Sequence, residues 1–496
     1  MSTTYEDKNR QAMPRCVDYA TAASLGLLRA IKNRQIELGN LSSNARDEWL
    51  RNPTIFTAVD LLSEAIIVKD FASDEAINSA KFILNKAPQS FKFIRELAHS
   101  FLQETSSIDP GQSPSSLELH YKRIANLKRT VRMYPYNPIA WSELSLCYAT
   151  LRQADKSRVA LQVALNIGGN NRFILRSAAR CFVHMGEPDR SVWILNKSGV
   201  CTVDPWIASA EIAICESLGL KSKCVTKARY FLQDDNLTDF SRSELAVGMG
   251  TIQMKHGDVR HAKKLMKQAL RDPTENALAQ AQWMTTQLGT DIGDITDIVR
   301  LEGQVPGSYE AQARRFFYNI DFPKSLEASQ LWARFQQLSS RPVIQGAFIA
   351  STFLEDDKKA ISILMSSMPA QRDDFLFTNN YAFSLVNSGQ LEDGRKQLAT
   401  INVNSLSRRE NLTLLATNGL VFFRTGEAEK GRKLYSMAID GFAQSNDAAD
   451  AALAAYFLAL EEKRIGSEVA KSTIDEAKAR IAKLKIPPLD FLAKKL

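Results

Sequence analysis

The sequence predicts an all-α protein built from antiparallel helix pairs that stack along the chain. Three observations support this fold class. Cys147, Cys181 and Cys215 are spaced by 34 residues twice, with similar residues around each one. A period between about 20 and 50 residues indicates stacked supersecondary units. The chain of 496 residues is too long for one compact core, and apolar residues recur at helical spacings in most of its segments.

The composition predicts a folded protein that is soluble and cytoplasmic. Apolar residues make up 45% of the chain, charged residues 24%, and the net charge of +8 is mild for this length. Six cysteines without a Cys-x-x-Cys pair argue against a disulfide framework and a zinc ribbon. Residues 1–10 do not resemble a secretory signal, and no apolar run approaches the roughly 18 residues that a spanning helix needs. We therefore expect no membrane association, no metal and no cofactor.

Residues 1–102 are expected to form a helical region with one divergent repeat. Apolar residues at helical spacings predict a long amphipathic helix over 14–38, with Pro14 in its first turn. Asn52-Pro53 opens a second unit, and its back half, 74–88, has small residues at Ala76 and Ala80 that anticipate the later repeats. The stretch 103–116 is rich in Ser, Pro and Gly, which predicts an exposed loop.

A helix is expected over 117–133, and the repeats become distinct after it. In the stretch 138–168, large, small and aromatic residues follow one another in the order of a known repeat: Trp141, Leu144, Ser145, Tyr148, Ser157, Leu161 and Ala164. This stretch resembles the tetratricopeptide repeat (TPR). The resemblance implies a right-handed superhelix of helix pairs, with small residues where two helices cross closest and bulky residues on either side.

Further units keep the same register. The second runs through Ala178, Ala179 and Ser191, the fourth places Gly250 at the crossing, and a late one places Gly419 and Gly431 there. We expect a first TPR-like array over 117–288 and a second over 308–446, with capping helices over 447–496. Residues 289–307 fit no repeat, so they are expected to be an irregular break, either a hinge or a divergent second helix.

The three cysteines share one repeat position beside the helix crossing, which predicts small buried hydrophobic residues rather than a metal or redox cluster. No metal-binding, phosphate-binding or dinucleotide-binding motif is present in the sequence. Cys181 and His184 lie three apart, but the register directs the cysteine into the packing and the histidine away from it. Catalytic residues are therefore not expected, and the chain is predicted not to be an enzyme.

In proteins of this family the first helices line a concave groove. In the second clear unit the groove positions include Phe173, Arg176 and Arg180, which could hold a carboxylate or phosphate while the ring takes an apolar side chain. The alternative is that the arginines form salt bridges with Glu143 or Glu216 of neighbouring repeats. The other groove positions implied by the register are His184, Lys255, Asn379, Asn387 and Arg424.

Two basic stretches provide the alternative function. The first carries Lys122, Arg123, Lys128, Arg129 and Arg132, and the second carries Arg260, His261, Lys263, Lys264, Lys267 and Arg271. Such stripes could bind a nucleic-acid backbone, although most charge runs are solvated faces. The leading hypothesis is a protein–protein interaction scaffold or adaptor, and by analogy the regulatory or recognition subunit of a complex. Its expected partner is a protein, with an acidic segment as the candidate ligand.

Overall fold

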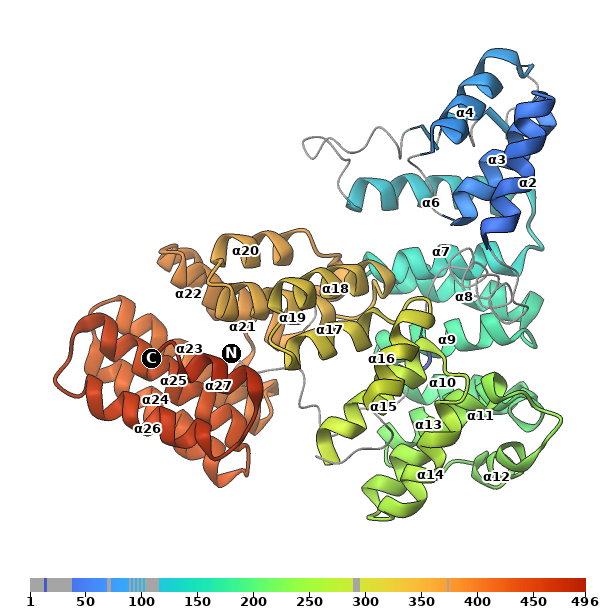
Figure 1. Ribbon diagram of the computed structural model, residues 1–496. Coiled ribbons are helices and arrows are strands. Elements are labelled where there is room, and N and C mark those ends of the chain that lie inside the picture. Colours follow the sequence, from blue (N-terminus) through green and yellow to red (C-terminus); the bar gives the residue numbers. More distant parts are fainter. Residues whose placement is uncertain are drawn as a thin grey trace. The chain divides into compact units, whose positions relative to one another are not determined.

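The computed structural model describes residues 13–15, 38–68, 73–88, 91, 94–95, 98–99, 101–102, 116–288, 295–372 and 374–496. All regular elements in these ranges are helices (Figure 1). The chain divides into two compact units, one formed by Asp18–Tyr121 and the other by Met1–Val17 together with Lys122–Leu496. The predicted all-α class is therefore confirmed for the described part of the chain. Most of the helix predicted over 14–38, and the loop predicted over 103–116 except Ser116, lie outside the described residues.

The smaller unit contains α2 (Leu38–Arg51), α3 (Ile55–Val68) and α4 (Asp74–Lys86). Its core is small and apolar, with Leu62 and Ile83 fully buried and Trp49 nearly so. Ser73 caps α4 by accepting a hydrogen bond from the backbone N–H of Ala76 at 3.3 Å. Helix α6 (Ser116–Met133) begins in this unit and continues into the larger one.

The larger unit is a succession of helix pairs in chain order, as the repeat predicts. The two helices of each pair pack on one another, and short connections join them where the connecting residues are described. The pairs are α7 (Pro138–Thr150) with α8 (Ala154–Gly168), α9 (Arg172–His184) with α10 (Pro188–Lys197), α11 (Pro205–Ser217) with α12 (Val225–Gln233), α13 (Asp239–Lys255) with α14 (Val259–Ala269), and α15 (Glu275–Leu288) with α16 (Ile295–Gln304).

The succession continues to the end of the chain. It comprises α17 (Tyr309–Tyr318) with α18 (Phe322–Phe335), α19 (Arg341–Phe348) with α20 (Asp357–Met365), α21 (Phe375–Asn387) with α22 (Leu391–Ala399), α23 (Arg408–Arg424) with α24 (Ala428–Gln444), α25 (Ala448–Ile465) with α26 (Ala470–Ala482), and the final α27 (Pro487–Ala493). Short helical turns lie at 200–202, 369–372 and 403–405, and a π-helical turn at 349–353 extends α19. Of the predicted break over 289–307, residues 295–304 form α16, the second helix of a pair, and 289–294 lie outside the described residues.

Local sequence explains where the helices begin and turn. Asn137 and Asp204 accept hydrogen bonds from backbone N–H groups of the first turns of α7 and α11, and a proline occupies the first position of both helices. In several pairs the chain reverses at a glycine with positive φ, for example Gly257 (85°) and Gly426 (83°), whereas the α7–α8 turn uses Arg152 (60°). A residue with a side chain adopts this conformation at a cost, so these glycines favour the tight turn.

Small residues lie at the helix crossings, as the TPR resemblance implies. Ser145 donates a hydrogen bond to the carbonyl oxygen of Ser157 at 2.9 Å across the α7–α8 crossing. A Cβ atom added to Gly431 of α24 would lie 2.8 Å from the carbonyl oxygen of Gly419 in α23. Cys147, Cys181 and Cys215 are thiols outside any disulfide with at most 2% of their surface exposed, which confirms that they are buried packing residues.

Two contacts join parts of the larger unit that are distant in sequence. Leu146 of α7 shares an apolar cluster with Leu338 and Ala370, and α7 contacts the short helix at 369–372. At the other end, Phe491 of α27 lies edge-on to Phe322 of α18 with ring centroids 5.0 Å apart. The helix pairs are therefore held together by more than contacts between neighbours.

Candidate binding site

Helix α9 carries four of the residues predicted to face a groove. Asn171 starts the helix by accepting hydrogen bonds from the backbone N–H groups of Phe173 at 2.9 Å and Ile174 at 3.3 Å. Phe173, Arg180 and His184 are half-buried, whereas Arg176 is buried with 8% of its surface exposed. Of the four predicted groove residues on α9, three therefore remain partly accessible to solvent and Arg176 does not.

Arg176 belongs to a buried ion pair that links three helices. Its guanidinium donates to a carboxylate oxygen of Glu244 on α13 at 3.1 Å, and it lies over the indole ring of Trp206 on α11, 4.4 Å from the ring centroid. Only 10% and 4% of the Arg176 and Glu244 side chains are exposed. Burial in a low-dielectric environment strengthens such a pair, but also makes each charge dependent on the other.

Arg176 does form a salt bridge, but the alternative prediction named the wrong acids, Glu143 or Glu216. Glu143 pairs with Arg123 at 3.4 Å and Glu216 with Lys255 at 3.9 Å. Arg176 instead reaches two helix pairs along the chain because Trp206, which lies between, provides a flat ring for the guanidinium to cross. The acid that neutralises Arg176 is Glu244 of α13.

Glu244 also fixes the start of α15. It accepts hydrogen bonds from Thr274 Oγ1 at 3.1 Å and Asn276 Nδ2 at 3.2 Å. Asn276 is buried, and the same Nδ2 donates to the main-chain carbonyl oxygen of Met13 at 3.1 Å. A short non-helical stretch, the Met13–Arg15 segment, therefore lies against helices that follow it by more than 250 positions.

The segment's arginine is held by a second buried acid. Arg15 Nη2 donates to Glu310 Oε2 at 2.7 Å, and only 6% and 9% of the two side chains are exposed. With its amide oxygen facing the guanidinium, Gln336 accepts from Arg15 Nη1 at 2.6 Å and Nε at 3.1 Å. Glu310 Oε1 also accepts from Arg341 at 2.9 Å. We call Asn276, Glu310, Gln336 and Arg341 the Arg15 site.

A further acid contributes to the electrostatics of this site. Burial raises the pKa of the Glu275 carboxyl above its ordinary value, and the nearby positive charge of Arg15 acts in the opposite direction. Glu244 raises this pKa further by like-charge repulsion, and Arg176 lowers it. Four charged groups of α9, α13, α15 and the Met13–Arg15 segment therefore influence one another.

Two of the three predicted groove residues of the second array, Asn387 and Arg424, lie in polar contacts. Arg424 donates to Glu461 at 2.7 Å and to the side-chain oxygen of Asn387 at 3.1 Å. Burial raises the pKa of Glu461, and the positive charge of Arg424 opposes this shift. Asn379 is fully buried, so its amide does not face solvent. The prediction that these three residues bind a partner remains a prediction.

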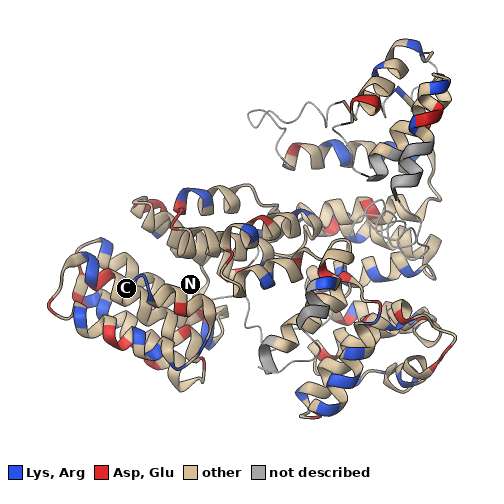
Figure 2. Ribbon diagram, viewed as in Figure 1, with Lys and Arg blue, Asp and Glu red and all other residues tan. Residues whose placement is uncertain are grey.

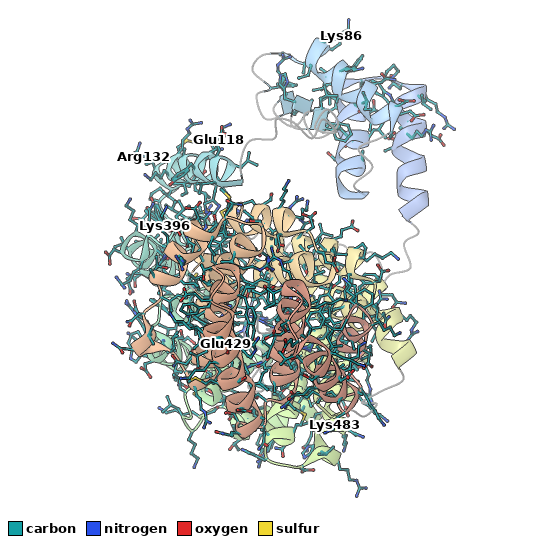
Figure 3. The ribbon with its side chains drawn as sticks, turned by 90° about the vertical axis from the view of Figure 1, so that its left-hand side faces the viewer. Lys86, Glu118, Arg132, Lys396, Glu429 and Lys483 are labelled. Atoms are coloured by element: carbon teal, nitrogen blue, oxygen red, sulfur yellow. The ribbon has the colours of Figure 1, made fainter. Side chains whose placement is uncertain are left out.

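The basic stretches lie on exposed helix surfaces. On α6, Lys122, Lys128, Arg129 and Arg132 are exposed, and Arg132 lies at the outer edge of the view in Figure 3. On α14, Lys264 and Lys267 are exposed and Lys263 is half-buried, while Arg271 lies 3.9 Å from Asp239. Figure 2 shows basic and acidic residues interspersed along most of the other helices.

Sequence reasoning missed the Met13–Arg15 segment and its site. Pro14 was expected to begin a helix, but residues 13–15 are not helical. The repeat pattern carries no information about residues outside it, so it gave no indication of the pairing with Glu310. The nearest signal in the sequence is the acid Glu310 in the first turn of α17, a place where acids are common in any helix.

Within the described ranges, no helix is both long and apolar enough to cross a membrane, and no group of three or more His, Cys, Asp or Glu side chains could hold a metal ion. A small concavity lies between α21, α23, α24 and α25, with Tyr435, Asp450 and Phe457 in its wall.

No protein-family model and no curated protein matches this chain. Among solved structures, it is similar to one described as the APC/C hetero-tetramer Cut9–Hcn1, with 13% identity, 95% of this chain and 96% of that chain covered, and a TM-score of 0.39. The yeast Tom70 structure is 13% identical; the match covers 89% of this chain and 98% of that chain, with a TM-score of 0.32. The structure of a monomeric IFIT1 mutant with Gppp-AAAA is 12% identical; the match covers 70% of this chain and 90% of that chain, with a TM-score of 0.38. With scores this low, the repeat fold rests on the helix pairs themselves.

Proposed function

We propose that this chain is a non-enzymatic scaffold or adaptor that binds a segment of a partner protein along the first helices of its repeats. In this role it would serve as the recognition or regulatory subunit of a complex. One observation supports the proposal most directly. The helices already hold a short piece of chain, Met13–Arg15, through an amide donated to a main-chain carbonyl and a carboxylate that takes a guanidinium. Contacts of this kind are typical of peptide recognition.

The half-buried residues of α9 are the candidates for contact with such a partner. Phe173, Arg180 and His184 retain accessible surface, whereas Arg176 is neutralised by Glu244. An acidic partner segment would therefore reach Arg180, which keeps accessible surface, rather than the buried Arg176. Reversing the charge of Arg176 would place two carboxylates together in a buried site, so Arg180→Glu is the more informative substitution.

Site-specific photo-crosslinking tests this proposal. A photoreactive phenylalanine analogue replaces Phe173 in the full chain, and the same analogue replaces Val159 of α8, whose surface is 65% exposed, as the control. In extracts of the native source, we expect one protein to crosslink at position 173 and not at 159, and Arg180→Glu to reduce its yield. A partner captured only at position 159, or equally at both, would contradict the proposal.

A second candidate function, binding of a nucleic-acid backbone, rests on one surface. Next to the exposed basic residues of α6, Tyr134 and Tyr136 expose 60% and 83% of their surface. Basic residues beside exposed aromatic rings suit a single strand, because the phosphates meet cations and the bases stack. Binding of RNA or DNA that weakens steeply with salt, and is lost in the Lys128→Glu, Arg132→Glu variant, would support this function. Absence of binding at low salt would exclude it.

A further inference from the structure

The contacts of Arg15 have the geometry of specific arginine recognition. Its guanidinium faces Glu310 on one side and Gln336 on the other, with three donor–acceptor distances of 2.6 to 3.1 Å. A planar fork of donors meets two acceptor groups, and lysine cannot reproduce this arrangement. With 6% of its surface exposed, the side chain is removed from water, so the acid and the amide must replace its hydration.

The two residues before Arg15 are also held. The carbonyl of Met13 accepts the hydrogen bond from Asn276, and the Met13 side chain packs against the apolar cluster that contains Leu338 and Ala370. Pro14 is buried. The site therefore contacts an apolar side chain, a proline and an arginine in succession, together with one main-chain oxygen.

The site is built by the helices rather than by the segment. Besides its contact with the segment, Glu310 pairs with Arg341 and Asn276 donates to Glu244, so both side chains also have partners on the helices. These contacts fix the acceptor and donor groups on α13, α15, α17 and α19. A site with independent support can exchange one occupant for another of the same chemistry, because its binding groups are preorganised.

We propose that the Arg15 site is a binding site for an arginine-bearing segment of a partner protein, of the type apolar–Pro–Arg, and that Met13–Arg15 competes for it within the same chain. This inference rests on the proposed function, since it names the ligand class of the same scaffold. It also reverses the charge expected of the ligand, because the carboxylate of Glu310 takes the guanidinium of a basic segment here, whereas Arg176 is already neutralised by Glu244.

Peptide binding to the full chain tests the proposal. The probe is a fluorescent peptide with the sequence of residues 11–18 in which serine replaces the cysteine, and its affinity is measured by polarisation. We expect weak binding to the wild-type chain and at least about tenfold tighter binding to Arg15→Ala, because the competing segment no longer fills the site. Arg15→Lys, which keeps the charge but loses the fork, should give an intermediate affinity.

Three controls complete the experiment. A probe with alanine at its arginine should not bind, and Glu310→Gln in the Arg15→Ala background should abolish binding of the intact probe. Arg480→Ala, which removes a surface arginine paired with Glu476, should behave as wild type. Equal affinity of the wild-type chain and the Arg15 variants, or retention of binding by Glu310→Gln in chains whose helix content is unchanged, would overturn the proposal.

The two proposals fail in different ways. If a partner crosslinks at position 173 but is not displaced by the peptide and is equally recovered with Glu310→Gln, the scaffold function stands and the apolar–Pro–Arg ligand is wrong. If the peptide binds as expected but no protein crosslinks at position 173, the Arg15 site stands and the partner does not extend to α9.

Discussion

Arg176 and Glu244 lie 68 positions apart in the chain and form a buried ion pair that ties α9 to α13 across the ring of Trp206. Each of the two charges has lost most of its contact with water. The pair therefore connects helix pairs that are not neighbours, and its removal has consequences beyond one repeat.

Loss of Arg176 is expected to destabilise the array strongly. Arg176→Met leaves Glu244 buried without its counter-charge, which should lower the free energy of unfolding by about 3–5 kcal/mol. The control is Arg158→Ala: Arg158 pairs with Glu187 and is about a third exposed, so its loss should cost at most about 1 kcal/mol. Urea denaturation followed by circular dichroism measures both. Similar effects of the two substitutions would contradict the role assigned to burial.

Close helix packing at Gly431 should make this position intolerant of a methyl group. A Cβ atom there would lie 2.6 Å from the ring of Phe423 and 2.8 Å from a backbone oxygen. Gly431→Ala should therefore cost about 1–3 kcal/mol of stability. The matched control is Gly303 of α16, where an added Cβ meets nothing within 4 Å, so Gly303→Ala should stabilise by about 0.5–1 kcal/mol. Thermal unfolding of both variants checks the opposite signs.

The buried cysteines are expected to resist thiol reagents. Burial, with a smaller contribution from Glu211, raises the pKa of Cys215 to about 12. At pH 8 only about one thiol in 10⁴ would then be ionised, compared with roughly a quarter of an unperturbed cysteine. Since Cys16 lies outside the described residues, the measurement uses a Cys16→Ser chain. Ellman's reagent should label its remaining thiols only after denaturant is added; rapid labelling of the native chain would show that the thiols are accessible.

Asp450 should make stability depend on pH in a defined direction. Burial raises its pKa above the ordinary 3.8, although the ion pair with Arg409 opposes the shift. Because the folded pKa is the higher one, the stability contributed by the neutral carboxyl is fully present below about pH 3.8 and is lost as the pH rises through the folded pKa. Asp450→Asn does not titrate, so its stability relative to wild type should increase from pH 4 to pH 7. A constant difference over this range would refute the assignment.

The fold could be predicted from the sequence because each repeat encodes its own packing. The spacing of Cys147, Cys181 and Cys215 and the small residues at positions such as Gly419 and Gly431 reflect contacts between neighbouring helices, which recur at a fixed separation. The site could be predicted only in part. Phe173, Arg180 and His184 follow from the register, but the partner of Arg176 does not, because it lies two helix pairs away.

The Arg15 site shows why the other site residues could not be predicted from a repeat pattern. Arg15 and Glu310 are separated by 295 positions and belong to no common repeat. Such a pair arises from the three-dimensional path of one chain segment, for which a single sequence carries no periodic signal. The same holds for Leu146 and Ala370, which belong to one apolar cluster without any shared repeat position.

The return of α27 onto α18 changes how this array is expected to come apart. In a simple repeat protein each end can fray separately, because every unit contacts only its neighbours. Here Phe491 packs against Phe322, and Lys495 donates to the carbonyl oxygen of Phe353 at 3.0 Å. The last helix thus ties the final helix pairs to the middle of the array. A pulling force applied at residue 496 would have to break the contacts of Phe491 and Lys495 before the last helix pair could unfold.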